Sequence, residues 1–274
     1  MDSVTGASPR QLARTAGALY LINIVGGAFA IGLVPALLVV PDLATTIHNI
    51  QTHQTLYRLG LVAHVVVTLT NIPMAVIFYD LLKVVDRRLA LLDVFFTLVA
   101  TAVEVAGLLD QFTPLVLLDN GRYPSALPAS QLHALAYLPG DLSTIDYSIY
   151  GLFYGFDILC VAYLVHRSTF LPKTIGVLLA VDGLAYLVSG FANLLTPGFA
   201  AHLAPWSELP APVGEGSLCL WLLVAGVNIA RWKERASAAT WRGSFWVVRG
   251  QPEPPGRTFV AGSHGTFILV RSAS

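Results

Sequence analysis

The chain has 274 residues, of which 55% are hydrophobic and only 12% are charged. Soluble domains carry about 25% charged residues, so this composition excludes an ordinary soluble protein. The 16 basic and 16 acidic side chains cancel, and bulk charge therefore gives no indication of nucleic-acid binding. The apolar residues fall in runs of about 18 or more, which is the pattern of membrane-spanning helices.

We predict an all-α fold, a six-transmembrane-helix bundle with short amphipathic surface helices in the two longer outer loops. The membrane domain covers residues 14–232, between an N-terminal tail of residues 1–13 and a C-terminal tail of residues 233–274. We expect the C-terminal tail to be poorly ordered, either disordered or a weak hairpin, with β-like runs at 244–249 and 266–271. The expected spans are residues 15–40, 57–85, 89–118, 146–166, 174–195 and 209–230.

The two longer outer loops each contain a short apolar periodicity. In residues 41–54, Asp42 is positioned to cap a helix that carries apolar residues at i, i+4 and i+7. In residues 119–144, Ser130 could cap a second short amphipathic segment. Both segments are expected at the membrane surface.

The third span is unusual because it carries several acidic residues. Asp93 and Glu104 are eleven residues apart, which places them on one face of a helix, with Thr97 and Gln111 close to the same stripe. An ionised carboxylate near the middle of a bilayer costs about 2.5–3.5 kcal/mol, so this face should point to protein or water. The alternative is an ordinary structural role, in which Asp93 reaches the inner interface, Asp110 reaches the outer one and Glu104 bonds to a neighbouring helix.

Polar stripes also occur in three other spans. His64 and Asn71 lie on one face of the second span, and Tyr150, Tyr154 and Asp157 lie close together in the fourth, where tyrosine hydroxyls could hydrogen-bond to Asp157. The fifth span carries a stripe that begins at Asp182. The candidates for ligand or proton binding are His64, Asn71, Glu104, Asp157 and Asp182.

Three functional interpretations follow. In the first, the internal polar cluster binds or passes a small solute or protons, with a buried carboxylate exchanging protons with His64 or with water from the outer side. In the second, the protein is a structural or partner-binding membrane subunit without transport. The third, an intramembrane enzyme, is the least favoured because the sequence has no phosphate-binding loop, zinc-protease motif or nucleophile elbow. No catalytic residue, metal site or cofactor is indicated, and Cys160 and Cys219 are interpreted as small buried hydrophobic residues.

The basic residues indicate an orientation. With six spans and a cytoplasmic N-terminus, the outer segments hold only Arg58 and Arg122, and all other lysines and arginines lie inside. This asymmetry follows the positive-inside rule and places both termini in the cytoplasm. Trp232, Lys233 and Arg235 would then anchor the end of the sixth span at the interface.

Several segments resemble a known family. The block Ser-Thr-Phe-Leu-Pro-Lys-Thr-Ile-Gly-Val-Leu-Leu at residues 168–179, followed by residues 183–187, is the most specific, and residues 13–21 and 56–60 are also similar. Together they resemble the bacterial multi-pass membrane proteins described as domain of unknown function 4386, over roughly residues 10–232. The resemblance implies a helical protein of the bacterial inner membrane. It supplies no catalytic or ligand-binding residue to carry over.

Overall fold

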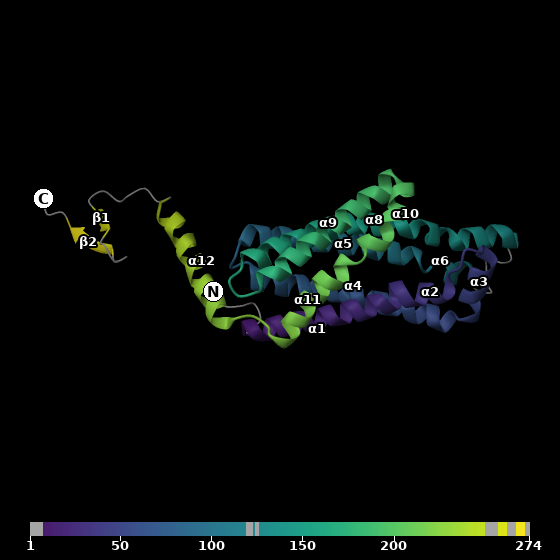
Figure 1. The fold of residues 1–274 in the computed structure, drawn as a ribbon, viewed down its shortest axis with the longest axis horizontal. Coiled ribbons are helices and arrows are strands. Elements are labelled where there is room, and N and C mark those ends of the chain that lie inside the picture. Colours follow the sequence, from purple (N-terminus) through teal and green to yellow (C-terminus); the bar gives the residue numbers. More distant parts are fainter. Residues whose placement is uncertain (1–7, 119–122, 124–125, 250–256, 262–266, 272–274) are drawn as a thin grey trace.

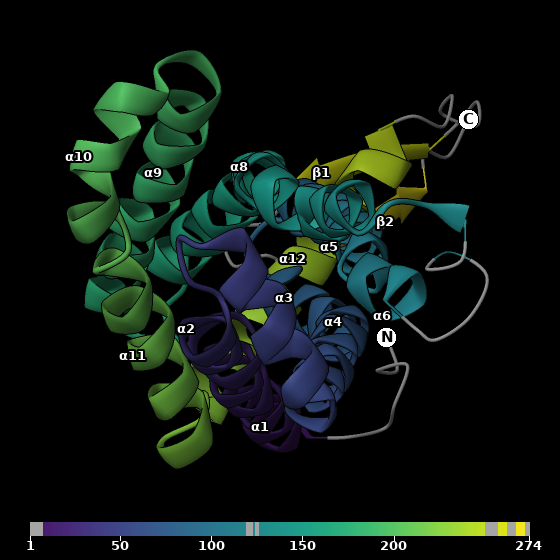
Figure 2. The ribbon, with the colours of Figure 1, turned by 90° about the vertical axis from the view of Figure 1, so that its right-hand side faces the viewer.

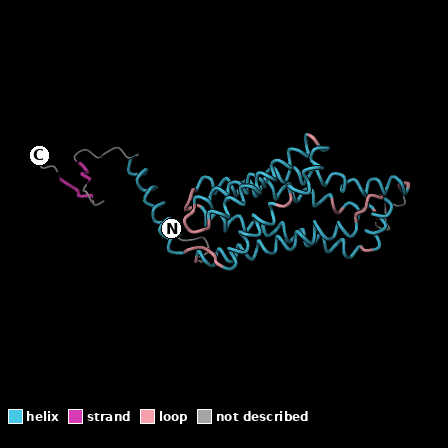
Figure 3. The backbone as a smooth tube through the Cα atoms, in the orientation of Figure 1, coloured by secondary structure: helices cyan, strands magenta, loops and turns pink. Residues whose placement is uncertain are grey.

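A computed structural model describes residues 8–118, 123, 126–249, 257–261 and 267–271. In this part of the chain the fold is a long bundle of helices, followed by a two-stranded hairpin (Figures 1 and 3). The elements are α1 (Pro9–Gly27), the π-helix η1 (Ala28–Leu33), α2 (Val34–Leu38), α3 (Leu43–Thr52), α4 (Gln54–Leu82), α5 (Arg87–Asp110), α6 (Thr113–Leu117), α8 (Ala129–Arg167), α9 (Lys173–Leu195), α10 (Pro197–Ser207), α11 (Pro210–Val224), α12 (Ile229–Arg249), β1 (Arg257–Ala261) and β2 (Phe267–Arg271).

Five helical segments of the described chain are long and apolar enough to cross a membrane. They are Pro9–Leu38, Gln54–Leu82, Arg87–Leu117, Ala129–Arg167 and Lys173–Leu195. A sixth crossing is formed if α11 is counted together with the first part of α12, to which it is bent by 102°. The outer faces carry many exposed leucine, valine and phenylalanine side chains, as a lipid-facing surface requires. The predicted all-α membrane bundle is therefore confirmed.

The six long helices form a closed ring. Contacts run from α1 to α4, then to α5, α8, α9 and α11, and α11 packs back against α1. Figure 2 shows this arrangement along the bundle. Small residues allow the closest approaches: a Cβ on Gly17 would lie 2.8 Å from the backbone nitrogen of Leu223, and one on Gly176 would lie 2.7 Å from that of His166. Polar side chains from several helices face the inside of the ring.

The first span is a composite helix. Ser8 and Gln11 form a capping box before α1, and Pro9 stands at the first helical position. The helix then changes to π-helical bonding over η1 and returns to α-helical bonding in α2. The helix that carries the first span thus begins at residue 9, within the segment expected to form the N-terminal tail.

The structure corrects two expected boundaries of the bundle. The amphipathic segment expected as a separate surface helix in residues 119–144 is the start of α8, which continues through Pro139 without a break; its N-cap position is Pro128 and not Ser130. The sixth span ends early, at Val224, because Gly226 adopts a left-handed conformation (φ 67°) and Asn228 caps a new helix by accepting a hydrogen bond from the Arg231 amide. The other surface helix, α3, is capped by Asp42 as predicted.

The C-terminal region differs in part from the expectation. The run at residues 244–249, predicted to be β-like, is the end of α12, and residue 232 lies inside this helix. The predicted second strand is found as β2, paired antiparallel with β1. The Trp232 indole donates a hydrogen bond to the Leu81 carbonyl, so the start of α12 is fixed to the bundle. Residues 250–256, 262–266 and 272–274 of the tail that was expected to be poorly ordered lie outside the described residues.

Candidate functional site

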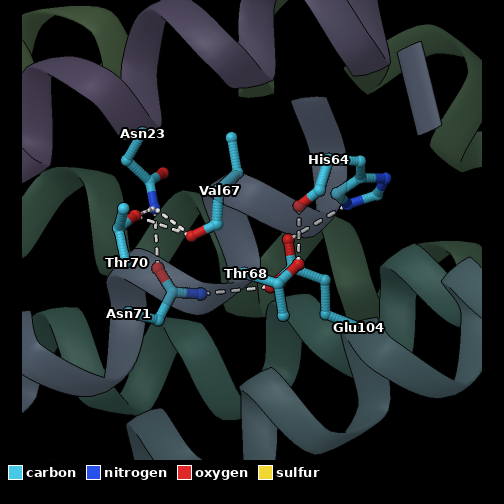
Figure 4. Close-up of polar contacts among 7 residues, drawn as sticks. All are labelled: Asn23, His64, Val67, Thr68, Thr70, Asn71 and Glu104. Carbon is cyan, nitrogen blue, oxygen red and sulfur yellow. Dashed lines mark hydrogen bonds and ion pairs between the residues drawn. The ribbon is translucent and has the colours of Figure 1, made fainter. Parts of the chain in front are cut away.

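The first polar centre joins α4 and α5. His64 Nε2 lies 3.2 Å from Glu104 Oε1, and the two side chains are only 8% and 10% exposed. The second oxygen of Glu104 accepts a hydrogen bond of 3.1 Å from Asn71 Nδ2 (Figure 4). The His64–Asn71 stripe predicted for the second span therefore faces Glu104, and both carboxylate oxygens of Glu104 have partners.

The same centre extends to α1 through Asn23. Asn23 Nδ2 donates to Asn71 Oδ1 at 2.6 Å and also lies near the Thr70 hydroxyl and the Val67 carbonyl (Figure 4). Asn71 is thus held from both sides, with its oxygen bound to Asn23 and its nitrogen bound to Glu104. This series of hydrogen bonds fixes the orientation of both side-chain amides, because only one placement of the amide nitrogen and oxygen satisfies all the contacts.

The second polar centre joins α5 and α8. The Thr97 hydroxyl lies 2.8 Å from Asp157 Oδ1 and 3.1 Å from the Asp93 carbonyl. The carboxyl of Asp93 lies against that of Asp157, yet its Oδ1 atom has no hydrogen-bond partner in the described part of the chain. Asp93 is 2% exposed and therefore buried among the helices, whereas the alternative interpretation placed it at the inner interface. Two carboxyl groups in such contact require a shared proton or a further partner.

A small cavity lies between the two centres. Its volume is ≈ 30 Å³, room for about one or two water molecules. Glu104 itself is not part of the wall, but its partner Asn71 is. The polar residues that line the cavity are Tyr20, Asn71, Asp93, Thr97, Thr101, Tyr150, Tyr154 and Asp157.

The third polar centre surrounds Glu215 on α11, which sequence reasoning did not select. The hydroxyls of Tyr20 and Tyr154 both donate to Glu215 Oε2 at 2.9 Å, and that of Tyr186 donates to Oε1 at 3.4 Å. The expectation that tyrosines of the fourth span bind Asp157 is therefore wrong for Tyr154, whose hydroxyl binds Glu215. Because Tyr20 and Tyr154 also line the cavity, this centre touches the same space as the aspartate pair.

Asp182 is the most isolated of the predicted residues. It lies on α9 and is 1% exposed, and neither carboxyl oxygen has a hydrogen-bond partner among the described residues. It stands beside α11: a Cβ on Gly214 would lie 3.2 Å from the Cβ of Asp182, and Glu215 on the same helix interacts with Asp182 electrostatically. A buried carboxylate without a partner costs several kcal/mol, so this group needs a proton or a bound molecule.

The family comparison fits this picture. The model of the family described as Domain of unknown function (DUF4386) matches residues 15–226, more than half of the chain. The chain belongs to this family. No curated protein and no solved structure matches the chain.

All five predicted site residues, and Glu215 with its tyrosines, lie inside the DUF4386 region, whereas α12 and the hairpin follow it. The structure brings His64, Asn71 and Glu104 into direct contact, places Asp157 across the cavity from Asn71, and leaves Asp182 beside Glu215. Within the described residues, no group of three or more His, Cys, Asp or Glu side chains is arranged to hold a metal ion. Cys160 and Cys219 are buried free thiols.

Proposed function

We propose that this DUF4386 protein binds protons in its polar interior and passes them, alone or with a small solute, across a bacterial inner membrane. The observation that carries the proposal is the contact between His64 and Glu104 inside the ring, linked by Asn71 to a cavity that the Asp93–Asp157 pair also lines. Histidine and carboxylate side chains are the usual carriers of protons in membrane proteins. Here they lie on adjacent helices, away from lipid.

The positions of these groups support a route along the bundle. Glu104 is six residues from the end of α5 at Asp110, and Asp93 is six residues from its start at Arg87. At 1.5 Å per residue, the two acids are about 16 Å apart along the helix axis and each is about 9 Å from one end. Asn71 and the cavity lie between them, so a proton bound at His64 and Glu104 has a short path of polar groups and space for water toward Asp93 and Asp157.

The charges at the two ends of the bundle support the orientation. One end carries the basic residues Arg10, Arg14, Lys83, Arg87, Arg88, Arg167, Lys173, Arg231, Lys233 and Arg235. Described acids at the other end include Asp42, Asp110 and Glu208. We assign the basic end, and with it both termini, to the cytoplasm. Glu104 and His64 then lie in the outer half and the Asp93–Asp157 pair in the inner half.

Proton flux into proteoliposomes tests the proposal. Purified protein is reconstituted with a pH-sensitive dye inside, and an ion gradient sets the driving force. Glu104→Gln and Asp157→Asn should each abolish the flux that the unchanged protein supports, because each removes a proton acceptor while keeping a side chain of the same shape. Asp110→Asn is the matched control: this acid is on the same helix as Glu104 but is exposed, so its variant should keep the flux.

A structural role is the second candidate, and one specific observation favours it. Both oxygens of Glu104 are occupied by local partners, so the Asn23–Asn71–Glu104–His64 chain would also lock α1, α4 and α5 together. The two functions separate when flux and stability are measured on the same variants. Unchanged flux in Glu104→Gln and Asp157→Asn, together with lower resistance to unfolding in detergent, would support the structural role and refute proton transfer.

A further inference from the structure

A larger hollow lies at the basic end of the bundle, where the chain breaks between α11 and α12. Its volume is ≈ 370 Å³. Phe170, Gly226 and Val227 are buried and form its floor, whereas Arg10 and Trp221 are exposed at its rim. The hollow is therefore open, lies at one end of the ring, and is separate from the cavity between the polar centres.

The break in the chain creates this space. Gly226 has a φ of 67°, which a side chain would disfavour, and a Cβ there would lie 3.3 Å from Arg10 Cγ. The Asn228 amide donates to the Phe170 carbonyl at 3.3 Å, which fixes the segment against the loop before α9. Glycine thus lets the stem of Arg10 pass close to the backbone, and the exposed Arg10 side chain forms part of the lining of the hollow.

The electrostatics of the hollow favour an anion. Arg10 makes no hydrogen bond or ion pair with another described residue, and other basic residues lie at the same end of the bundle. Of the acids that the structure places at this end, Asp80 is paired with Lys83, Asp86 caps α5, and Glu234 is exposed on α12 and is not part of the lining of the hollow. Among the described residues the charge of Arg10 therefore has no ionic partner, and its five N–H donors suit a phosphate.

The hollow also continues onto the lipid-facing surface. Trp221 is exposed at its rim, and the neighbouring residues Leu220 and Val224 of α11 are exposed as well. Tryptophan is typical of the level of lipid headgroups, with apolar residues at the depth of the acyl chains. A free phosphate would use the arginine alone, whereas a lipid would use both the arginine and this apolar face.

We propose that this hollow binds the headgroup of an anionic phospholipid from the leaflet at the basic end. Arg10 contacts the phosphate, Trp221 packs beside the glycerol region, and an acyl chain runs along Leu220 and Val224. The site is independent of proton transfer, because none of its residues belongs to the three polar centres. It ties a lipid of the negatively charged cytoplasmic leaflet to the point where α12 leaves the ring.

Native mass spectrometry of the detergent-solubilised full chain tests the site, with phosphatidylglycerol and phosphatidylcholine of identical acyl chains as probes. The unchanged protein should retain phosphatidylglycerol in preference to phosphatidylcholine. Arg10→Gln should weaken phosphatidylglycerol binding about tenfold, the loss of one charge-assisted contact. Arg14→Gln is the matched control: it removes the same charge one turn further along α1, outside the hollow, and should change the affinity less than about twofold.

Three results would overturn the proposal. They are equal retention of the two lipids, an Arg10→Gln affinity equal to that of the unchanged protein, and inorganic phosphate binding as tightly as the lipid does. Gly226→Ala should also weaken binding, because its side chain would displace Arg10. If that variant fails to fold, the Arg10 and Arg14 pair still decides the question, since both positions are exposed and tolerate glutamine.

Discussion

The tyrosines around Glu215 offer a sharp test of the site geometry. Tyr20→Phe keeps the ring, including its edge-to-face contact with Phe78 at 6.3 Å between centroids, and removes only the hydroxyl. A hydrogen bond to a charged group contributes about 1.5–3 kcal/mol in soluble proteins, and those in membrane proteins average about 0.6 with a maximum near 1.7. We therefore expect Tyr20→Phe to lower the free energy of unfolding by about 1–2 kcal/mol.

Companion variants make the test stricter. Tyr154→Phe should cost as much as Tyr20→Phe, since both hydroxyls lie 2.9 Å from the same oxygen, and Tyr186→Phe should cost about 0.5 kcal/mol or less, since its contact is 3.4 Å. The Tyr20–Tyr154 double variant should lose about 1 kcal/mol more than the sum of the single losses, because Glu215 Oε2 is then left without a donor.

Unfolding in mixed micelles of mild detergent and dodecyl sulfate, followed by circular dichroism, measures these differences. Tyr163→Phe is the control, because Tyr163 lies on α8 but is 52% exposed on the lipid side and should change stability little. Equal losses for Tyr186→Phe and Tyr20→Phe, or simple additivity in the double variant, would refute the shared-oxygen geometry.

Three further predictions concern packing, pH and orientation. Gly176→Val should destabilise the fold by about 1–3 kcal/mol, because its Cβ would meet backbone atoms at 2.7 and 2.8 Å, whereas Gly27→Val, with nothing within 4 Å, should be nearly neutral in the same unfolding assay. Hydrogen bonds from Thr45 hold the pKa of Asp42 below its ordinary value, so this cap stabilises α3 above the ordinary pKa of aspartate, about 3.9, and the stabilisation is lost as the pH falls through the lowered folded-state pKa. The protection of the α3 amides against hydrogen exchange, corrected for the intrinsic pH dependence of the exchange rate, should fall on acidification in the unchanged protein and not in Asp42→Asn. A loss of protection of equal size in both proteins would contradict the assignment. A phosphatase reporter fused after Asn120 should be active outside the cytoplasm, and cytoplasmic activity of a fluorescent reporter at that position would reverse the orientation.

The sequence predicted the spans well because length and apolar composition are local properties of a membrane helix. The sequence-based prediction failed where solvent or a neighbouring element decides whether a helix continues or ends. Pro139 does not break α8, since the carbonyl it frees belongs to Leu135, which is exposed outside the packed part of the ring. The end of α11 did carry a local signal: Gly226 and Asn228 are the residue types that end one helix and cap the next.

The polar centres show the same limit. Helical periodicity identified the shared face of His64 and Asn71, and it placed Asp93 and Glu104 on one side of α5. It could not say that Glu104 faces α4 while Asp93 faces α8, because partners on other helices depend on the order of the ring. Glu215 was missed for this reason: its tyrosines come from three different helices, and no spacing along the sequence brings them together.

Water in the cavity is the feature on which the proposed route most depends, and radiolytic footprinting in oxygen-labelled water measures it directly. Met74 lines the cavity and is 7% exposed, whereas Cys219 is 1% exposed and is not part of its wall. If the cavity holds water between Asn71 and the aspartate pair, Met74 should be oxidised in the folded protein while the intrinsically more reactive Cys219 is spared. Protection of Met74 to the same extent as Cys219 would mean a dry cavity, and it would contradict a proton route through the interior of the ring.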